Sequence, residues 1–417
     1  MNTGKLCAIL LIAFCSLAAR GVTTIEDVAR QFCRNQIDVD SLFNYINNGH
    51  GGEAYWWSLH NSEKNDPMAY YILGRCYLSG IGTTEDMSKA VPLFEKAINH
   101  GVDEALVDLG KMYINGWGVE NEKNSTKGIQ YLKKASERKL GRGYDVLGLL
   151  YLDKQDYPKA YQLFNLAAAA NYSGGYLDMG FMYENGFGVE QNDAKSLELY
   201  RIAADKGNRI ALCNVGLFYE HGKAVDMNHE TALKYYMASA EKGDARGSYK
   251  VGYIHQWGDI PVEVSYEEAA KWYKLAVEKE YLPAKVAYAL LLFDGLGVSE
   301  DKTQAIEILE SVGMENVSPF HACRISEYFT EINSVKALKW AKFAHDNADE
   351  YYTLATTAKL LGMIYLKGGK ELYDYQLAVK YLKEAAELGE PDCVALMKSL
   401  GEPFEVDETV ISNSVNE

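Results

Sequence analysis

The chain has 417 residues, of which 48% are apolar and 24% are charged. These fractions are ordinary for a folded soluble protein and exclude wholesale disorder. Its 58 Asp and Glu residues outnumber 42 Lys and Arg residues, giving a formal net charge of −16, which argues against nucleic acid or an anionic membrane surface as the main partner.

The first predicted element is a secretory signal peptide at residues 1–18. A single Lys5 precedes an apolar run from Leu6 to Phe14, and the small residues from Ser16 to Ala18 suit cleavage by signal peptidase. The run is shorter than the ~20 apolar residues that a membrane span needs. No later segment approaches that length without charges, so we expect a protein of the secretory pathway with no stable membrane span.

The second predicted element is a helical N-terminal cap at residues 19–65. The stretch 25–62 within it is rich in aromatic residues, namely Tyr45, Tyr55, Trp56 and Trp57. This composition fits a cap on the repeat array that follows it in the chain.

A repeat of 36 residues dominates residues 66–390. The segment "KMYINGWGVE" at 111–120 returns as "FMYENGFGVE" at 181–190. A second signature follows each loop, as in "KSLELYRIAADKG" at 195–207, with small and bulky residues at helical spacing. One glycine recurs at the same place in most first segments, with Ala289 standing in once: Gly74, Gly110, Gly180, Gly216, Gly252 and Gly362.

Each unit is therefore predicted to be two antiparallel helices joined by a loop. A glycine inside a helix costs ~1 kcal/mol relative to alanine, so its recurrence indicates a place where the facing helix comes too close for a side chain. The tyrosines three residues after the glycine are expected to fill the core beside it, at Tyr77, Tyr113, Tyr151, Tyr183, Tyr219 and Tyr365.

Stacking of these pairs is expected because one pair cannot cover its own apolar stripe, whereas neighbouring pairs bury a continuous core. The predicted fold class is all-α: a right-handed α/α solenoid of about nine helix pairs at residues 66–390. Residues 391–417 are predicted to form a C-terminal cap helix and a disordered tail.

The recurrent pattern resembles the Sel1-like repeat, an α/α relative of the tetratricopeptide repeat with a longer loop. Leu-Gly-x-x-Tyr-x-x-Gly-x-Gly-Val carries the resemblance in the first helix and loop, and Lys-Ala followed by aromatic and alanine pairs carries it in the second helix. Two units, 141–172 and 317–354, have short linkers and resemble tetratricopeptide pairs. The second of them has Ile325 in place of the glycine.

The resemblance also implies a function. Members with a signal peptide resemble the luminal adaptor of the membrane ubiquitin-ligase complex in endoplasmic reticulum (ER)-associated degradation. This implies a non-catalytic scaffold in the ER lumen whose partners are ubiquitin-ligase components, chaperones or misfolded glycoproteins. A homodimer is left open. The alternatives are a secreted or cell-surface scaffold acting outside the cell, and a hydrolase carried on the repeats.

Motifs of catalysis are not found in the sequence. It contains no HExxH, GxSxG or P-loop motif and no dinucleotide fingerprint after a strand, so we predict no enzyme, no catalytic residue and no cofactor. No pair of cysteines or histidines stands at ligand spacing, so we predict no metal site. Five scattered cysteines follow the signal peptide and are expected to be buried thiols: Cys33, Cys76, Cys213, Cys323 and Cys393.

The candidate binding site is a polar groove along the first helices. Ala105, Leu109 and Met112 share one face of their helix, which leaves a polar set on another face. If this second face lines the inner curve, it suits a peptide or a glycan; the alternative is a merely solvated helix face. The candidate residues at equivalent points are Asp108, Lys111, Asn115, Asp178, Asn185, Asn214, His221, Lys250 and Trp257.

Two glycosylation sequons lie at unit junctions, where we expect surface exposure. They are Asn124-Ser125-Thr126 and Asn171-Tyr172-Ser173. Asn124 and Asn171 are therefore the predicted N-glycosylation sites.

Overall fold

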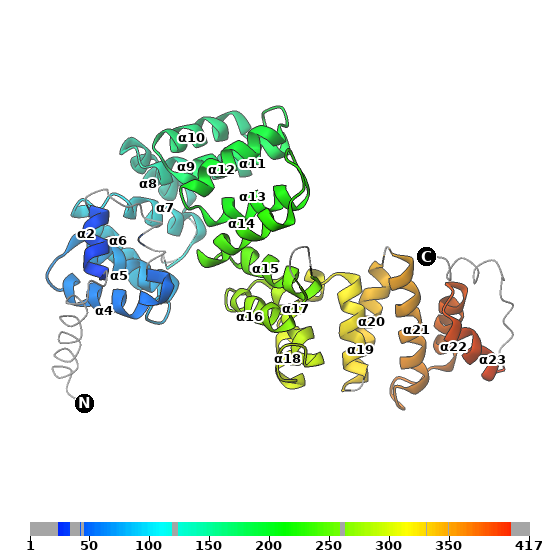
Figure 1. Ribbon diagram of the computed structural model, residues 1–417. Helices are drawn as coiled ribbons and strands as arrows, with labels where there is room; N and C mark the ends of the chain where they lie inside the picture. The colour runs from blue at the N-terminus through cyan, green and yellow to red at the C-terminus, as the bar shows by residue number, and fades with distance from the viewer. Residues whose placement is uncertain are drawn as a thin grey trace, which may run out of the picture. The chain divides into compact units, whose positions relative to one another are not determined.

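The computed structural model describes residues 24–33, 42, 46–118, 124–258, 263–330, 332–348 and 350–401. Every regular element in these ranges is a helix (Figure 1). The chain divides into two compact units, Met1–Gly247 and Ser248–Glu417, which are treated separately below. The predicted signal peptide at 1–18 and tail beyond 401 lie outside the described residues, and the division into cap, repeats and tail stays a prediction.

The first unit begins with α2 (Ile25–Cys33), the π-helical turn η1 (Ile46–His50) and α4 (Gly51–Ser62). Five helix pairs follow. Their first helices are α5 (Pro67–Ser79), α7 (Ala105–Asn115), α9 (Gly141–Asp153), α11 (Ser173–Asn185) and α13 (Arg209–Glu220). Their second helices are α6 (Met87–Asn99), α8 (Ser125–Glu137), α10 (Tyr157–Ala169), α12 (Asp193–Asp205) and α14 (His229–Glu241).

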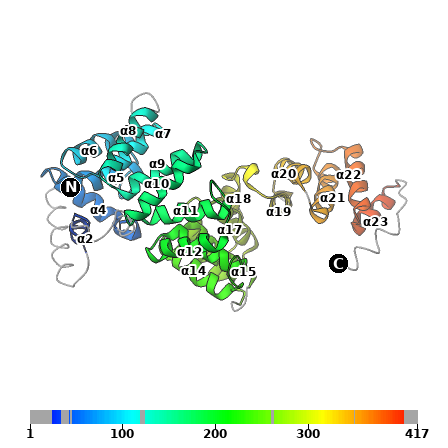
Figure 2. The same cartoon turned by 90° about the horizontal axis from the view of Figure 1, so that it is seen from above.

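The second unit continues from the boundary inside α15 (Ala245–Trp257). It holds α16 (Tyr266–Val277), α17 (Leu282–Asp294), α18 (Lys302–Glu310), the 3-10 turn η2 (Met314–Asn316), α19 (Pro319–Thr330), α20 (Ser334–Asn347), α21 (Tyr351–Lys367), α22 (Tyr375–Glu387) and α23 (Pro391–Ser399). Within this unit α17 packs on α18, α19 on α20, and α21 on α22 (Figure 2). Successive helix pairs in both units confirm the predicted all-α solenoid.

Local sequence explains where the helices begin and end. Asp66 starts α5 by accepting hydrogen bonds from the backbone N–H groups of Met68 and Ala69. After α7 the chain turns through Gly116 and Gly118, with φ of 76° and 62°. A Cβ on Gly118 would lie 2.1 Å from the carbonyl oxygen of Met87, so this position needs glycine for both backbone conformation and space.

Where a first helix carries the repeat glycine, that glycine faces a bulky side chain of the second helix. A Cβ added to Gly74 would lie 2.7 Å from Cε1 of Phe94, and one added to Gly180 would lie 2.7 Å from Cε1 of Tyr200. Both distances are far shorter than a carbon–carbon contact, which confirms the predicted close approach. In the first unit the facing rings of four helix pairs are fully buried: Phe94, Phe164, Tyr200 and Tyr236.

The tyrosines three residues after the glycine are less buried than predicted. Tyr365 is buried, but the other five are half-buried. Tyr113, for example, stacks on Tyr131 at a ring separation of 5.7 Å, with the Lys127 ammonium 4.0 Å from the Tyr113 ring centre. The hydroxyl group keeps these rings at the edge of the core, because there it can reach a polar partner such as the Lys127 ammonium.

Candidate functional site: the first-helix face

The candidate site is defined here by register around the recurring glycine. Positions two before, one after and five after this glycine are spaced by three and four residues, so they lie on one side of the helix. We call this side, on α5, α7, α9, α11 and α13, the first-helix face. On α7 it carries Asp108, Lys111 and Asn115, all of which the sequence had singled out.

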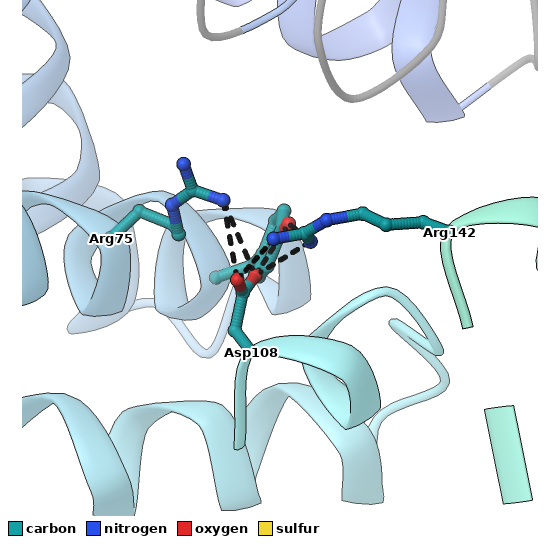
Figure 3. A network of polar contacts seen from close by, with 4 residues as sticks. Arg75, Asp108 and Arg142 are labelled. Carbon is teal, nitrogen blue, oxygen red and sulfur yellow. Dashed lines mark hydrogen bonds and ion pairs between the residues drawn. The ribbon is translucent and has the colours of Figure 1, made fainter. Parts of the chain in front are cut away.

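Asp108 does not line an open groove, which corrects the prediction for this residue. It is 3% exposed, and its carboxylate accepts hydrogen bonds from the Tyr71 hydroxyl at 3.0 Å, Arg75 Nη1 at 3.3 Å and Arg142 Nη1 at 3.0 Å (Figure 3). Tyr71 and Arg75 lie on α5 and Arg142 lies on α9. The carboxylate therefore ties three successive first helices together.

The charges of this network explain how it tolerates burial. Burial by itself would raise the pKa of Asp108, but the guanidinium groups of Arg142 and Arg75 outweigh it and hold that pKa well below its ordinary value of 3.8. Burial and the neighbouring carboxylate both raise the pKa of Tyr71 well above 10. Tyr71 thus stays a neutral hydrogen-bond donor while Asp108 stays ionised.

Lys111 is half-buried beside this network. Burial lowers the pKa of its ammonium, and the nearby Arg142 and Arg75 lower it further, while Asp108 acts in the opposite sense. Within the described part of the chain, the ammonium itself makes no hydrogen bond and no ion pair. Lys111 is therefore a positive group on the first-helix face that is available to a partner.

Apolar side chains occupy the middle of the face on the next helices. Leu149 on α9 is 42% exposed, Phe181 on α11 is 39% exposed, and Leu217 on α13 is half-buried. All three stand one residue after the glycine position. The Phe181 ring meets Phe187 edge to face at 5.7 Å, and Phe187 stacks on Tyr157 at 5.4 Å. The Phe181 side chain is thus restrained by neighbouring aromatic rings.

Two carboxyl groups adjoin these apolar residues. Asp145 on α9 is buried and Asp178 on α11 is half-buried, and their side chains are hydrogen-bonded to each other. Burial raises the pKa of Asp178 to about 6, and the hydrogen bond with Asp145 only partly opposes this. Asp178 therefore loses its proton at a higher pH than an ordinary aspartate does.

The remaining predicted groove residues of the first unit are more exposed than Asp108. Asn115 and Asn185 are exposed, and each side-chain amide donates to a carbonyl of its own helix, at 3.0 Å and 2.9 Å. Asn214 is half-buried and accepts a hydrogen bond from Arg246 at 3.4 Å, and His221 is exposed at the end of α13.

Lys250 and Trp257 belong to the second unit. Lys250 is half-buried, and Trp257 is 60% exposed with its ring 6.3 Å from that of Tyr253 on the same helix. The first unit therefore brings together seven of the nine predicted residues, and binding at the first-helix face stays a prediction.

Sequence reasoning missed Arg75, Arg142, Leu149 and Phe181. The signal for Leu149 and Phe181 was present, because both follow the repeat glycine as Lys111 does. Arg142 stands six residues before its glycine, Gly148, and carries no register signal.

Both predicted glycosylation sites are exposed. Asn124 caps the start of α8, where its side-chain oxygen accepts the backbone N–H of Lys127 at 2.9 Å. Asn171 takes a left-handed backbone conformation with φ of 62° between α10 and α11. Whether either is modified stays a prediction.

The described ranges also bear on the predictions for metal ligands, membrane spans and cysteines. No set of three or more His, Cys, Asp or Glu residues there is arranged to hold a metal ion. No described helix combines the length and the apolar character that crossing a membrane requires. The side chain of Cys33 lies outside the description. Four described cysteines are buried and form no disulfide with one another: Cys76, Cys213, Cys323 and Cys393.

Comparison with known proteins agrees with this architecture. The Sel1 repeat family model matches residues 67–102, 103–140, 146–172, 174–208, 209–244, 245–281, 283–311 and 358–390. The unit with Ile325 in place of the glycine falls between the last two matches.

Two curated relatives share only part of the chain. ERAD-associated E3 ubiquitin-protein ligase component HRD3B of Arabidopsis thaliana is 33% identical over 94 residues, 22% of this chain and 14% of that protein. Chitin synthase regulatory factor 3 of Schizosaccharomyces pombe is 27% identical over 144 residues, 32% of this chain and 15% of that protein. The chain thus spans only a small part of the length of either relative.

A solved structure matches over most of the chain. It is a protective antigen of uropathogenic Escherichia coli with an SLR fold, 23% identical, with a TM-score of 0.55 over 93% of this chain and 85% of that one. This likeness concerns the fold alone. Because the repeat model covers well over half of the chain, the protein belongs to the Sel1 repeat family.

Proposed function

We propose that the protein is a non-catalytic scaffold that binds other proteins through the first-helix face of its first unit. The observation that carries this proposal is the exposure of Leu149 and Phe181, 42% and 39%, at equivalent points of neighbouring packed helices. Exposed apolar side chains on adjacent elements are a common feature of interaction surfaces. The half-buried charge of Lys111 at the same register adds a polar contact for a partner.

We further propose that this scaffold acts in the ER lumen as an adaptor in ER-associated degradation. Three features support the assignment: the predicted signal peptide at 1–18, the exposed sequons at Asn124 and Asn171, and the 33% identity over 94 residues to a plant ERAD ligase component. Its partners would then be ubiquitin-ligase components, chaperones or misfolded glycoproteins. A net charge of −16 makes nucleic acid an unsuitable partner.

Site-directed crosslinking in a eukaryotic cell tests both parts. A photo-crosslinking amino acid is placed at Phe181, and in a matched control at Leu166, which is 40% exposed on the second helix α10. We expect ligase or luminal chaperone components to be captured from Phe181 and not from Leu166. Capture of extracellular proteins alone would favour a secreted scaffold, and equal capture from both positions would reject the first-helix face.

Glycosidase treatment gives an independent check of the compartment. Each of Asn124→Gln and Asn171→Gln is expected to remove one glycosidase-sensitive mobility step from the protein made in a eukaryotic cell. A chain that never shows such a step would count against the secretory assignment, while leaving the binding face untouched.

A further inference from the structure

The residue one position after the repeat glycine changes in character along the first unit. It is a cation on α5 and α7 and a large apolar residue on α9 and α11. These helices are neighbours, because an arginine of α5 bonds to an aspartate of α7, α7 packs against α9, and α9 packs against α11. We call the four residues the cation–apolar row: Arg75, Lys111, Leu149 and Phe181.

The cationic half of the row carries more positive charge than the fold neutralises. Arg75 and Arg142 both donate to the single carboxylate of Asp108, at 3.3 Å and 3.0 Å. In the described ranges the ammonium of Lys111 makes no hydrogen bond and no ion pair. Of the charged groups that act most strongly on this ammonium, two are cations and two are anions, so its own charge is left over: Arg142, Asp108, Arg75 and Asp145.

The setting of Lys111 strengthens its attraction for an anion. The residue is half-buried, and burial lowers the pKa of its ammonium. A charge that is partly removed from water attracts an opposite charge more strongly than an exposed one does, because the local dielectric constant is lower. The net charge of −16 repels an acidic segment at long range, but salt at 0.1 M screens exposed charges beyond ~10 Å. The short-range contact at Lys111 therefore decides the preference.

The apolar half of the row is not used by the fold. Leu149 and Phe181 keep 42% and 39% of their surface exposed, whereas the rings that fill the helix pairs are fully buried. The Phe187 ring, stacked on Tyr157, supports Phe181 from the side. A partner would therefore meet a surface that is already ordered, which reduces the entropy lost on binding.

Resting on the proposed function as a protein-binding scaffold, we propose that the cation–apolar row binds a partner segment with side-chain carboxylates at one end and large apolar residues at the other. The carboxylates lie at Lys111, beside Arg75, and the apolar residues cover Leu149 and Phe181. Each first helix contributes one contact, so the order of the row along α5, α7, α9 and α11 fixes the direction of the bound segment.

Fluorescence anisotropy with the purified full chain tests the chemistry of the partner. Four fluorescein-labelled peptides of equal length have neutral groups at both ends, so that no terminal carboxylate takes part. The first carries glutamates in one half and leucines in the other. The others replace Glu by Lys, replace Leu by Ser, or alternate Glu and Leu. We expect the first peptide to bind about tenfold more tightly than each of the others. Equal or tighter binding of any other peptide would overturn the proposal.

Variants locate the binding. Lys111→Met and Phe181→Ser are each expected to weaken binding of the first peptide by about fivefold, and only Lys111→Met should also reduce its dependence on salt. Two matched controls should leave binding unchanged: Lys133→Met, at an exposed lysine of α8, and Leu166→Ser, at an equally exposed apolar residue of α10. An equal loss with a control, or no loss with either row variant in a chain that keeps its helical circular dichroism, would refute the assignment.

Charge reversal separates recognition from packing. Lys111→Glu should abolish the preference for the glutamate peptide over the lysine peptide, because the charge at this position changes by two units. A preference that persists, or an equal loss of binding by both peptides, would overturn the role of Lys111 in recognition.

The peptide and crosslinking experiments can fail separately. If Phe181 captures a luminal protein but the first peptide is not preferred, the scaffold stands and the partner chemistry is wrong. If the peptide binds at the row but no ligase or chaperone component is captured, the row stands and the adaptor role is wrong.

Discussion

Asp108→Asn is the substitution that most directly tests how the first helices are held together. The asparagine side chain keeps the shape of the carboxylate but removes its charge, and its amide group would face arginine N–H donors. Arg142, 9% exposed, would then be a buried cation without its compensating anion. Arg75 has a side chain that is 19% exposed and keeps some contact with water.

The expected loss follows from these exposures. Breaking a buried ion pair by removing one partner costs about 3–5 kcal/mol, and we expect the lower end because Arg75 is partly solvated. Asp103→Asn is the matched control: it breaks an Asp–Arg pair with Arg138 at 3.7 Å, whose side chains are 32% and 67% exposed. Such an exposed pair contributes less than about 1 kcal/mol.

The pH dependence has a definite sign. The folded-state pKa of Asp108 lies below its ordinary value of 3.8, so its contribution to stability is complete above that value and is lost as the pH falls through the folded-state pKa. The difference between wild type and Asp108→Asn should therefore be constant from neutral pH to about pH 5 and shrink under stronger acid.

Urea unfolding followed by circular dichroism measures the global loss. Because repeat arrays need not unfold in one step, hydrogen exchange of the α5, α7 and α9 amides is measured alongside it. A loss no larger than that of Asp103→Asn, with unchanged exchange in these helices, would refute the claim that the network ties the three helices together.

Three further changes test other parts of the structure. Gly180→Ala should destabilise the protein by ~1–3 kcal/mol, because the new Cβ would lie 2.7 Å from the Tyr200 ring. In the control Gly52→Ala the new Cβ meets nothing within 4 Å, so this variant should lose no stability. Equal effects of the two variants in calorimetry would contradict the close approach at Gly180. The pKa of Asp178 is raised to about 6, so its folded state keeps a proton that the unfolded state releases, and stability falls as the pH rises from 3.8 to 6. Asp178→Asn should therefore raise the unfolding free energy at pH 7 by up to ~3 kcal/mol and leave it unchanged near pH 3, and a urea series with no such pH dependence would contradict it. Burial raises the pKa of the Cys76 and Cys323 thiols to about 12 and that of Cys393 to about 11. Iodoacetamide should therefore label these three thiols, and the buried Cys213, only on unfolding, and mass spectrometry finding them alkylated in the native state would contradict their burial.

The helix pairs could be predicted because their pattern is local. Gly180 and Tyr200 are twenty residues apart in one unit, and an equivalent glycine and bulky residue return in other units. The packing within a helix pair can therefore be predicted from the repeat itself. The edge of the core was harder to predict. A tyrosine such as Tyr113 has both an apolar ring and a hydroxyl group, and only its surroundings decide how far it is buried.

The candidate site was predicted in part, for a related reason. Register placed Lys111 and Asp178 on one face, and it could also have pointed to Phe181. Register could not show that Asp108 is buried, because that depends on residues in other units: Arg75 is 33 positions away and Arg142 is 34 positions away.

The sequence by itself determined the repeating helix pairs. A glycine in the first helix and a bulky side chain in the second return at a fixed period, and their close packing allows few other arrangements of the two helices. The tertiary structure alone decided which polar residues hold neighbouring units together and which face a partner. Tyr71 and Arg142 meet across 71 positions of sequence, and whether a charge between them is buried or solvated depends on how the helices of three units stack.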